Sequence, residues 1–162
     1  MTPDKATKAL ETLSPELMAE YTAYFATIKP KTDEEIFRRG CFALASVHTT
    51  WKYNVRLYAL LKDLAWIGSK KWLRSLIEES QAGLVNNRTK FYWEFAESYW
   101  KDPKSYRRKD GELWAVYRDR LQSLTLGLGH AKSAFYIELC YFEEAQITCL
   151  DTHLLQLFGL KG

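Results

Sequence analysis

Helix-starting and helix-ending residues recur along the whole chain, whereas strand signals do not. Ser14 followed by Pro15 is a typical helix start, and Thr32 with Glu35 three residues later fits a capping box. Between such signals, apolar residues recur every three or four positions, which is the period of an amphipathic helix. Glycine or proline separates one such segment from the next. The fold class is therefore predicted to be all-α.

The predicted helices begin and end at these signals. They span residues 15 to about 28, 33 to about 45, 51–64, 70–80, 87–100, 112–124 and 130–139, and a last helix is capped by Asp151. The helix over 51–64 is predicted to bury a single apolar stripe of Trp51, Val55, Tyr58, Leu61 and Leu64. Residues 140–142 are the one strand candidate and are too short to count as a strand.

Composition limits the kind of protein this is. Residues 1–162 are expected to form one domain, because 47% hydrophobic and 15% aromatic residues suffice for one core. The net charge of +3 gives no overall basic field, and the basic runs at 70–74 and 104–109 are typical of solvated faces.

Three scattered cysteines and the lack of long apolar runs indicate where the protein acts. Cys41, Cys140 and Cys149 are too few for a disulfide framework or a zinc site. No apolar run reaches 18 residues, and the first residues lack the apolar stretch of a signal peptide. These features predict an intracellular protein, cytoplasmic or associated with the nucleoid, without contact to a membrane.

The segment from Leu126 to Lys132 carries the strongest functional motif. Gly127 and Gly129 make a Gly-x-Gly turn within a helical hairpin at about 118–140, and His130 and Ala131 open the next helix. Glycines let a phosphate approach the backbone, and the free N–H groups and dipole of a helix N-terminus favour an anion. Such a hairpin would bind the DNA backbone without reading its sequence. The alternative is a plain turn between two helices.

An acidic step follows the hairpin after about one helix length. It reads Leu150-Asp151-Thr152-His153, and Asp151 suits the N-cap of a new helix. Its carboxylate is also suited to stabilise positive charge on a sugar. Together, hairpin and step resemble the helix-hairpin-helix DNA glycosylase superfamily, which includes endonuclease III and the 8-oxoguanine glycosylases.

This resemblance implies a fold, a reaction and a partner. The fold would be a two-lobed helical domain, and the protein would act as a monomer on double-stranded DNA with one flipped base. The reaction would be excision of a damaged or modified base, with an oxidised purine such as 8-oxoguanine as the first expectation. Asp151 would be catalytic.

Lys132 leaves the second catalytic role open. Bifunctional relatives carry a lysine on the second hairpin helix that attacks the sugar and forms a Schiff base, which gives AP lyase activity. The usual pattern is Gly-x-Gly-x-Lys, but here Ala131 takes that place and Lys132 comes one position later. One residue turns a helical side chain by about 100°. Lys132 is therefore either the nucleophile or a phosphate contact in a monofunctional enzyme that uses water.

Two upstream segments resemble the same superfamily more loosely. Residues 46–50 resemble its Ser-Ala-Gln-Ala-Thr segment, in which glutamine fills the gap left by the flipped base; here His48 takes that place, beside Thr49. Residues 84–90 resemble the entry to a later helix, where Arg88 and Lys90 are candidate DNA contacts. A capped helix break and solvated side chains are the respective alternatives.

No cofactor is expected beyond a monovalent cation at the hairpin. The iron–sulfur cluster of some relatives needs four cysteines, and this chain has three. His48, His130 and His153 lie on different elements without ligand spacing, so they are predicted as DNA contacts or structural residues and not as a metal site.

Two other functions fit the same motifs. The first is a base-modifying enzyme on the same scaffold, like the phage proteins that resemble this superfamily and are implicated in thymine hypermodification, and it would keep Asp151 but release no base. The second is a DNA-binding module without catalysis, in which Asp151 would be dispensable.

Overall fold

The computed structural model describes residue 8, residues 11–12, residues 14–150 and residue 155. Within these ranges all regular structure is helical and no strand occurs, which confirms the all-α prediction. In chain order the elements are α2 (Pro15–Ile28), α3 (Asp33–Ala45), α4 (Trp51–Leu60), η1 (Ala65–Gly68), α5 (Lys70–Ser80), α6 (Val85–Lys101), η2 (Pro103–Tyr106), α7 (Trp114–Leu124) and α8 (His130–Cys140).

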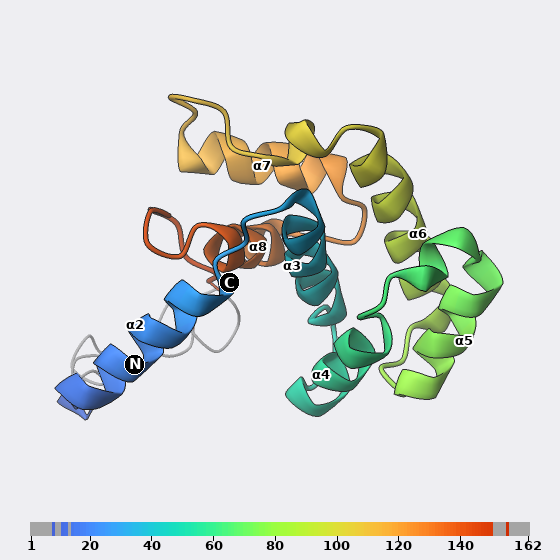
Figure 1. Cartoon of the computed structure of the whole chain (residues 1–162), viewed down its shortest axis with the longest axis horizontal. Coiled ribbons are helices and arrows are strands. Elements are labelled where there is room, and N and C mark those ends of the chain that lie inside the picture. Colours follow the sequence, from blue (N-terminus) through green and yellow to red (C-terminus); the bar gives the residue numbers. More distant parts are fainter. Residues whose placement is uncertain (1–7, 9–10, 13, 151–154, 156–162) are drawn as a thin grey trace.

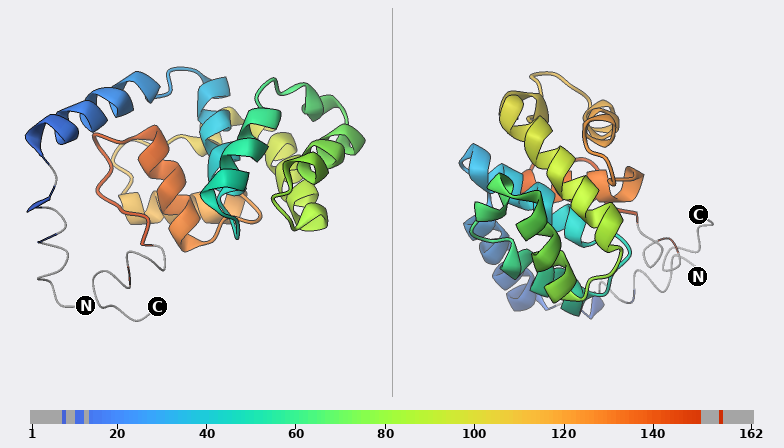
Figure 2. Two further views of the ribbon diagram at one scale, coloured as in Figure 1. Left: turned by 90° about the horizontal axis from the view of Figure 1, so that it is seen from below. Right: turned by 90° about the vertical axis from the view of Figure 1, so that its right-hand side faces the viewer.

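Helix α3 lies at the centre of the arrangement. It packs against α4, α6 and α8, while α5 packs on α4 and α6, and α7 packs on α8. Figure 1 shows α4, α5 and α6 on one side of α3 and α7 with α8 on the other. Helix α2 extends away from the other helices, as the side view in Figure 2 makes clear.

The helix starts follow the local signals. The hydroxyl of Ser14 accepts a hydrogen bond from the N–H of Leu17 at 3.1 Å at the start of α2. At α3 the predicted capping box is present: the N–H of Glu35 donates to Thr32 Oγ1 at 3.1 Å, and the N–H of Thr32 donates to Glu35 Oε2 at 3.0 Å. These bonds satisfy backbone donors that a helix leaves unpaired in its first turn.

Helix α4 differs from the prediction in both its end and its buried face. It ends at Leu60, because Leu64 adopts a left-handed backbone (φ 60°) and the chain turns into η1. Asn54, Leu57 and Leu61 are buried, whereas Trp51 and Val55 are exposed. The predicted stripe is therefore wrong for Trp51 and Val55 but correct for Leu61, because α4 turns the face of Asn54, Leu57 and Leu61 to the core.

Aromatic rings around Phe37 form the centre of the core. Phe37 of α3 stacks on Phe95 of α6, with ring centroids 4.9 Å apart, and contacts Tyr99 at 5.0 Å. Gly40, one turn further along α3, lies so close to α6 that a Cβ atom there would come within 2.4 Å of Phe95 Cζ. This glycine therefore allows α3 and α6 to approach closely enough for the rings to stack.

Arg88 of α6 is buried and binds the backbone at the end of α3 and in the turn before α6. It exposes 2% of its surface, and its guanidinium donates hydrogen bonds only to backbone carbonyls among the contacts described. The acceptors are the carbonyl oxygens of Leu44, Ala45, Val47, Ala82 and Gly83. Burial lowers the pKa of Arg88, but arginine remains charged in proteins. The side chain thus holds both the end of α3 and the turn between α5 and α6 against α6.

Replacement of Arg88 is expected to destabilise the protein strongly. Arg88→Ala leaves buried carbonyls without donors, so the free energy of unfolding should fall by roughly 3 kcal/mol or more. Lys90→Ala is the matched control: Lys90 is exposed on the same helix and pairs only loosely with Glu94, at 3.9 Å. Its loss should change stability by about 0.5 kcal/mol or less. Urea unfolding of both variants measures the difference, and equal small effects would contradict a structural role for Arg88.

Candidate functional site

A pocket of about 580 Å³ lies between the turn after α3 and the N-terminus of α8. This volume is within the usual range for a small-molecule or nucleotide-sized ligand. Three parts of the chain that are distant in sequence contribute to its walls. The described lining residues are Ser46, Val47, His48, Thr49, Gly127, Gly129, His130, Ala131, Lys132, Leu150 and Leu155.

The N-terminus of α8 makes one wall favourable for an anion. The helix begins at His130, and its first backbone bond from the turn runs from the N–H of Ser133 to the oxygen of Gly129, at 2.9 Å. The N–H groups of the three residues before Ser133 have no acceptor within the helix, and the helix dipole adds positive potential there. None of the lining residues that the structure describes is acidic. The wall therefore suits phosphate or another anion.

The two glycines of the turn have different roles. Gly127 has φ +95°, and a Cβ atom there would lie 2.5 Å from Phe91 Cδ2. Gly129 has an ordinary φ of −84°, and no atom lies within 4 Å of a Cβ built on it. Leu128 between them is buried in the core. The backbone shape of the turn thus requires glycine at 127, whereas at 129 glycine leaves the surface open for a ligand.

His48 and Thr49 line the opposite wall. His48 is exposed and adopts a left-handed backbone (φ 47°), which is uncommon for a residue other than glycine. The carbonyl of the preceding Val47 accepts a hydrogen bond from Arg88. The chain therefore turns out of α3 at a fixed point, and His48 projects from that turn.

Lys132 lines the pocket with its ammonium close to an aromatic ring. The side chain is half-buried, and its Nζ atom lies 5.5 Å from the ring centroid of Phe135. No carboxylate among the described residues forms an ion pair with it. Lys132 is thus a positive group at the pocket wall whose amine is free to contact a ligand.

His130 is held by the preceding helix. Its Nδ1 atom lies 3.0 Å from Gln122 Oε1, and its Nε2 atom lies 3.8 Å from Asp119 Oδ1. Both partners belong to α7. The imidazole therefore connects the start of α8 to α7 across the turn, in addition to lining the pocket.

Glu138 anchors the segment that leads back to the pocket. Its half-buried carboxylate accepts a hydrogen bond from the N–H of Cys149 at 3.1 Å, and burial raises its pKa. The next residue, Leu150, lines the pocket, as does Leu155. The predicted catalytic Asp151 and the predicted contact His153 lie outside the described residues, between these two leucines.

Two predicted DNA contacts do not lie at this pocket. Arg88 is buried and donates to backbone carbonyls, so its guanidinium has no surface to offer DNA, and this prediction does not fit the structure. Lys90 is exposed beside Glu94 and does not line the pocket.

Conversely, four residues line the pocket although sequence reasoning did not select them: Ser46, Val47, Leu150 and Leu155. Their only sequence signal is that they flank predicted site residues.

The basic run at 104–109 is partly used in folding. Arg107 forms an ion pair with Asp33 at 2.7 Å, and the guanidinium of Arg108 stacks over the ring of Trp114 at 4.2 Å. These contacts hold the segment between η2 and α7 against the helices.

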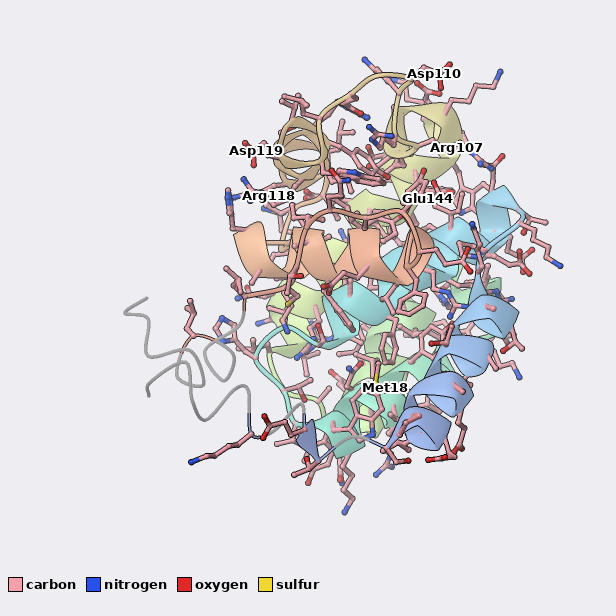
Figure 3. All side chains as sticks on the ribbon, turned by 90° about the vertical axis from the view of Figure 1, so that its left-hand side faces the viewer. Met18, Arg107, Asp110, Arg118, Asp119 and Glu144 are labelled. Carbon is pink, nitrogen blue, oxygen red and sulfur yellow. The ribbon has the colours of Figure 1, made fainter. Side chains whose placement is uncertain are left out.

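Charges of both signs alternate at this edge of the molecule. Figure 3 shows Arg107 and Asp110 on the segment before α7, and Arg118 and Asp119 on α7 itself. Arg118 and Asp119 form an ion pair at 2.8 Å. This edge is therefore not a uniform cationic surface, and the pocket is the better candidate for binding an anion.

The described residues provide neither a metal-binding cluster nor a membrane-spanning helix. Among them no group of three or more His, Cys, Asp or Glu side chains is placed to hold a metal ion. No helix in the same part of the chain has the length and apolarity needed to cross a bilayer. Burial raises the pKa values of Cys41 and Cys140, so these thiols are poor nucleophiles.

Comparison with known proteins adds no relative. No protein-family model, no curated protein and no solved structure matches this chain.

Substitution of the two glycines tests which of them the backbone shape of the turn requires. Gly127→Ala combines a strained φ with a clash against Phe91, so the free energy of unfolding should fall by about 1–3 kcal/mol. Gly129→Ala has room and an ordinary φ, and we expect a loss below about 1 kcal/mol. Thermal or urea unfolding of the two variants is the measurement. A Gly129 variant as unstable as the Gly127 variant would contradict this assignment.

Proposed function

We propose that this chain is a DNA glycosylase that removes a damaged or modified base, with an oxidised purine such as 8-oxoguanine as the first candidate. One observation carries the proposal. The pocket joins the turn at 46–49 to the hairpin at 127–132, and Leu150 and Leu155 on either side of Asp151 also line it. These are the segments in which the sequence resembles the helix-hairpin-helix glycosylases. Their convergence on one cavity supports the proposal.

The proposed binding mode follows from the charges at the pocket. The turn between α7 and α8 would act as the helix-hairpin-helix motif and bind a DNA phosphate with the backbone N–H groups at the start of α8. Helices α4–α6 and α7–α8, on the two sides of α3, would form the two lobes. His48 would enter the duplex where the target nucleotide has been flipped out. The partner is double-stranded DNA.

Asp151 is the proposed catalytic carboxylate. As the bond between base and sugar breaks, the base leaves with the bonding electrons and positive charge builds on C1′ and the ring oxygen of the sugar. A carboxylate beside the sugar stabilises that charge. A nucleophile then forms the new bond to C1′, and the departing base acquires a proton.

Lys132 is the proposed nucleophile. Lys132 lines the pocket, and its amine lies beside the ring of Phe135. No carboxylate among the described residues forms an ion pair with this amine. Attack of the amine on C1′ would displace the base and give a Schiff base after the sugar ring opens. Loss of a proton from C2′ would then release the 3′ phosphate and cut the strand. With water as the nucleophile, the reaction would stop at an abasic site.

Asp151→Asn should strongly slow base release. Because the amide carries no negative charge to stabilise the sugar, we expect the rate to fall at least about 100-fold. The measurement is base release from duplexes that carry single lesions, 8-oxoguanine included, with and without alkaline cleavage of the strand. Asp110→Asn, an exposed aspartate on the segment before α7, is the control and should keep the wild-type rate.

The same assay distinguishes the alternative functions. An altered base that remains attached to the DNA would indicate a base-modifying enzyme. Tight binding without any change in the base, unaffected by Asp151→Asn, would indicate a DNA-binding module. Either result would overturn the glycosylase proposal.

Borohydride trapping tests the role of Lys132. Reduction of a Schiff base links enzyme to DNA covalently, so the wild-type protein and Lys90→Ala should give a slow-migrating adduct with a substrate duplex, and Lys132→Ala should give none. Base release by the wild type without any adduct would show a monofunctional enzyme that uses water. In that case Lys132 contacts phosphate, and its loss should weaken binding.

A further inference from the structure

Trp51 is an exposed ring, whereas most of the aromatic rings whose exposure is described are buried or half-buried. It exposes 69% of its surface, more than any other aromatic residue whose exposure is described. It is the first residue of α4, two positions after Thr49 in the pocket wall. A single exposed apolar side chain is common on protein surfaces, so its surroundings decide whether it has a function.

Those surroundings hold the ring in place and connect it to the pocket. Trp51 packs edge-to-face against Phe42, with ring centroids 5.8 Å apart, and Phe42 lies 6.0 Å from Phe135. The Nζ atom of Lys132 in turn lies 5.5 Å from the ring centroid of Phe135. Trp51 is therefore the exposed end of a row of aromatic side chains that runs from the surface to the pocket lysine.

The charges of α4 indicate the chemistry of a partner. The helix carries two basic residues and no acidic residue: the ammonium of Lys52 lies 5.7 Å from the ring centroid of Tyr53, and Arg56 donates a hydrogen bond to Gln81 at 3.3 Å. The described pocket lining likewise contains no acidic residue. An exposed indole on a helix whose only charged residues are basic fits a polyanion that also presents flat apolar faces, which is the chemistry of unpaired nucleobases. Bases within a paired duplex are stacked on each other and do not present these faces.

We propose that Trp51 is a stacking platform for a base left unpaired beside the target nucleotide. This inference rests on the proposed function, because it places DNA across the pocket with His48 between the bases. Trp51 would stack on the orphaned or neighbouring base, and Lys52 would face the adjacent phosphate. The ligand class is a duplex with a locally open base pair, in preference to a fully paired duplex.

Binding to two matched duplexes tests the proposal. One duplex carries a tetrahydrofuran abasic analogue opposite a purine, which leaves that purine unpaired and cannot form a Schiff base. The other duplex has the same sequence and is fully paired. Fluorescence anisotropy of labelled DNA gives the dissociation constants of the full-length wild type and of Trp51 variants.

Trp51→Ala should weaken binding to the duplex with the unpaired purine about 10-fold, and change binding to the paired duplex less than about 2-fold. Trp51→Phe retains a flat ring and should lose no more than about 3-fold. Trp51→Leu retains an apolar contact to Phe42 but has no ring, and should resemble the alanine variant. Trp72→Ala, which removes a 41% exposed tryptophan of α5, is the control and should bind as the wild type does.

The possible failures are distinguishable. If the wild type binds neither duplex, the proposed function fails and the inference fails with it. If the wild type prefers the unpaired purine and Trp51→Ala keeps that affinity, only the stacking role is overturned. If the alanine variant does not fold, the comparison of Trp51→Leu with Trp51→Phe decides, and equal affinities would overturn stacking.

Discussion

The buried guanidinium of Arg88 is the interaction on which the candidate site depends. A helix leaves its last carbonyl groups without intrahelical donors, and a cation near its C-terminus also offsets the helix dipole. Arg88 meets both needs for α3, since it donates to the carbonyls of Leu44 and Ala45 and also to Val47 beyond the helix end. The chain can therefore leave α3 abruptly. The pocket wall, with His48 in a left-handed conformation, starts at that point.

Hydrogen bonds from tyrosines hold α6 and α8 against α3, and α8 provides the other pocket wall. Tyr92 and Tyr99 of α6 donate to the carbonyls of Cys41 and Asp33, and Tyr136 of α8 donates to the carbonyl of Ile36. Each of these hydroxyls is attached to a ring packed in the core, so each bond aligns a helix as well as satisfying a polar group. Because α8 is held in this way, its N-terminus remains opposite the turn that Arg88 fixes. The pocket is thus a consequence of the core.

Local signals were sufficient to predict the helices, whereas burial was not predictable from them. The capping box of Thr32 and Glu35 involves neighbours in the chain, so the sequence contains all of the information. Arg88 looked like a surface residue because arginine usually is one, and only the distant end of α3 supplies its partners. Likewise, the sequence indicated a tight turn at 127–129. It did not show that Phe91, on another helix, makes glycine necessary at 127 alone.

The position of Lys132 shows why a shift of one residue need not remove it from the pocket. Along most of a helix, such a shift turns a side chain by about 100° and directs it to another neighbour. Lys132, however, lies in the first turn of α8, which begins at His130. Side chains in a helix lean toward its N-terminus, so those of the first turn surround the same opening that the free N–H groups face. A lysine one position later therefore remains at the rim of the pocket, where its amine serves either a phosphate or a sugar.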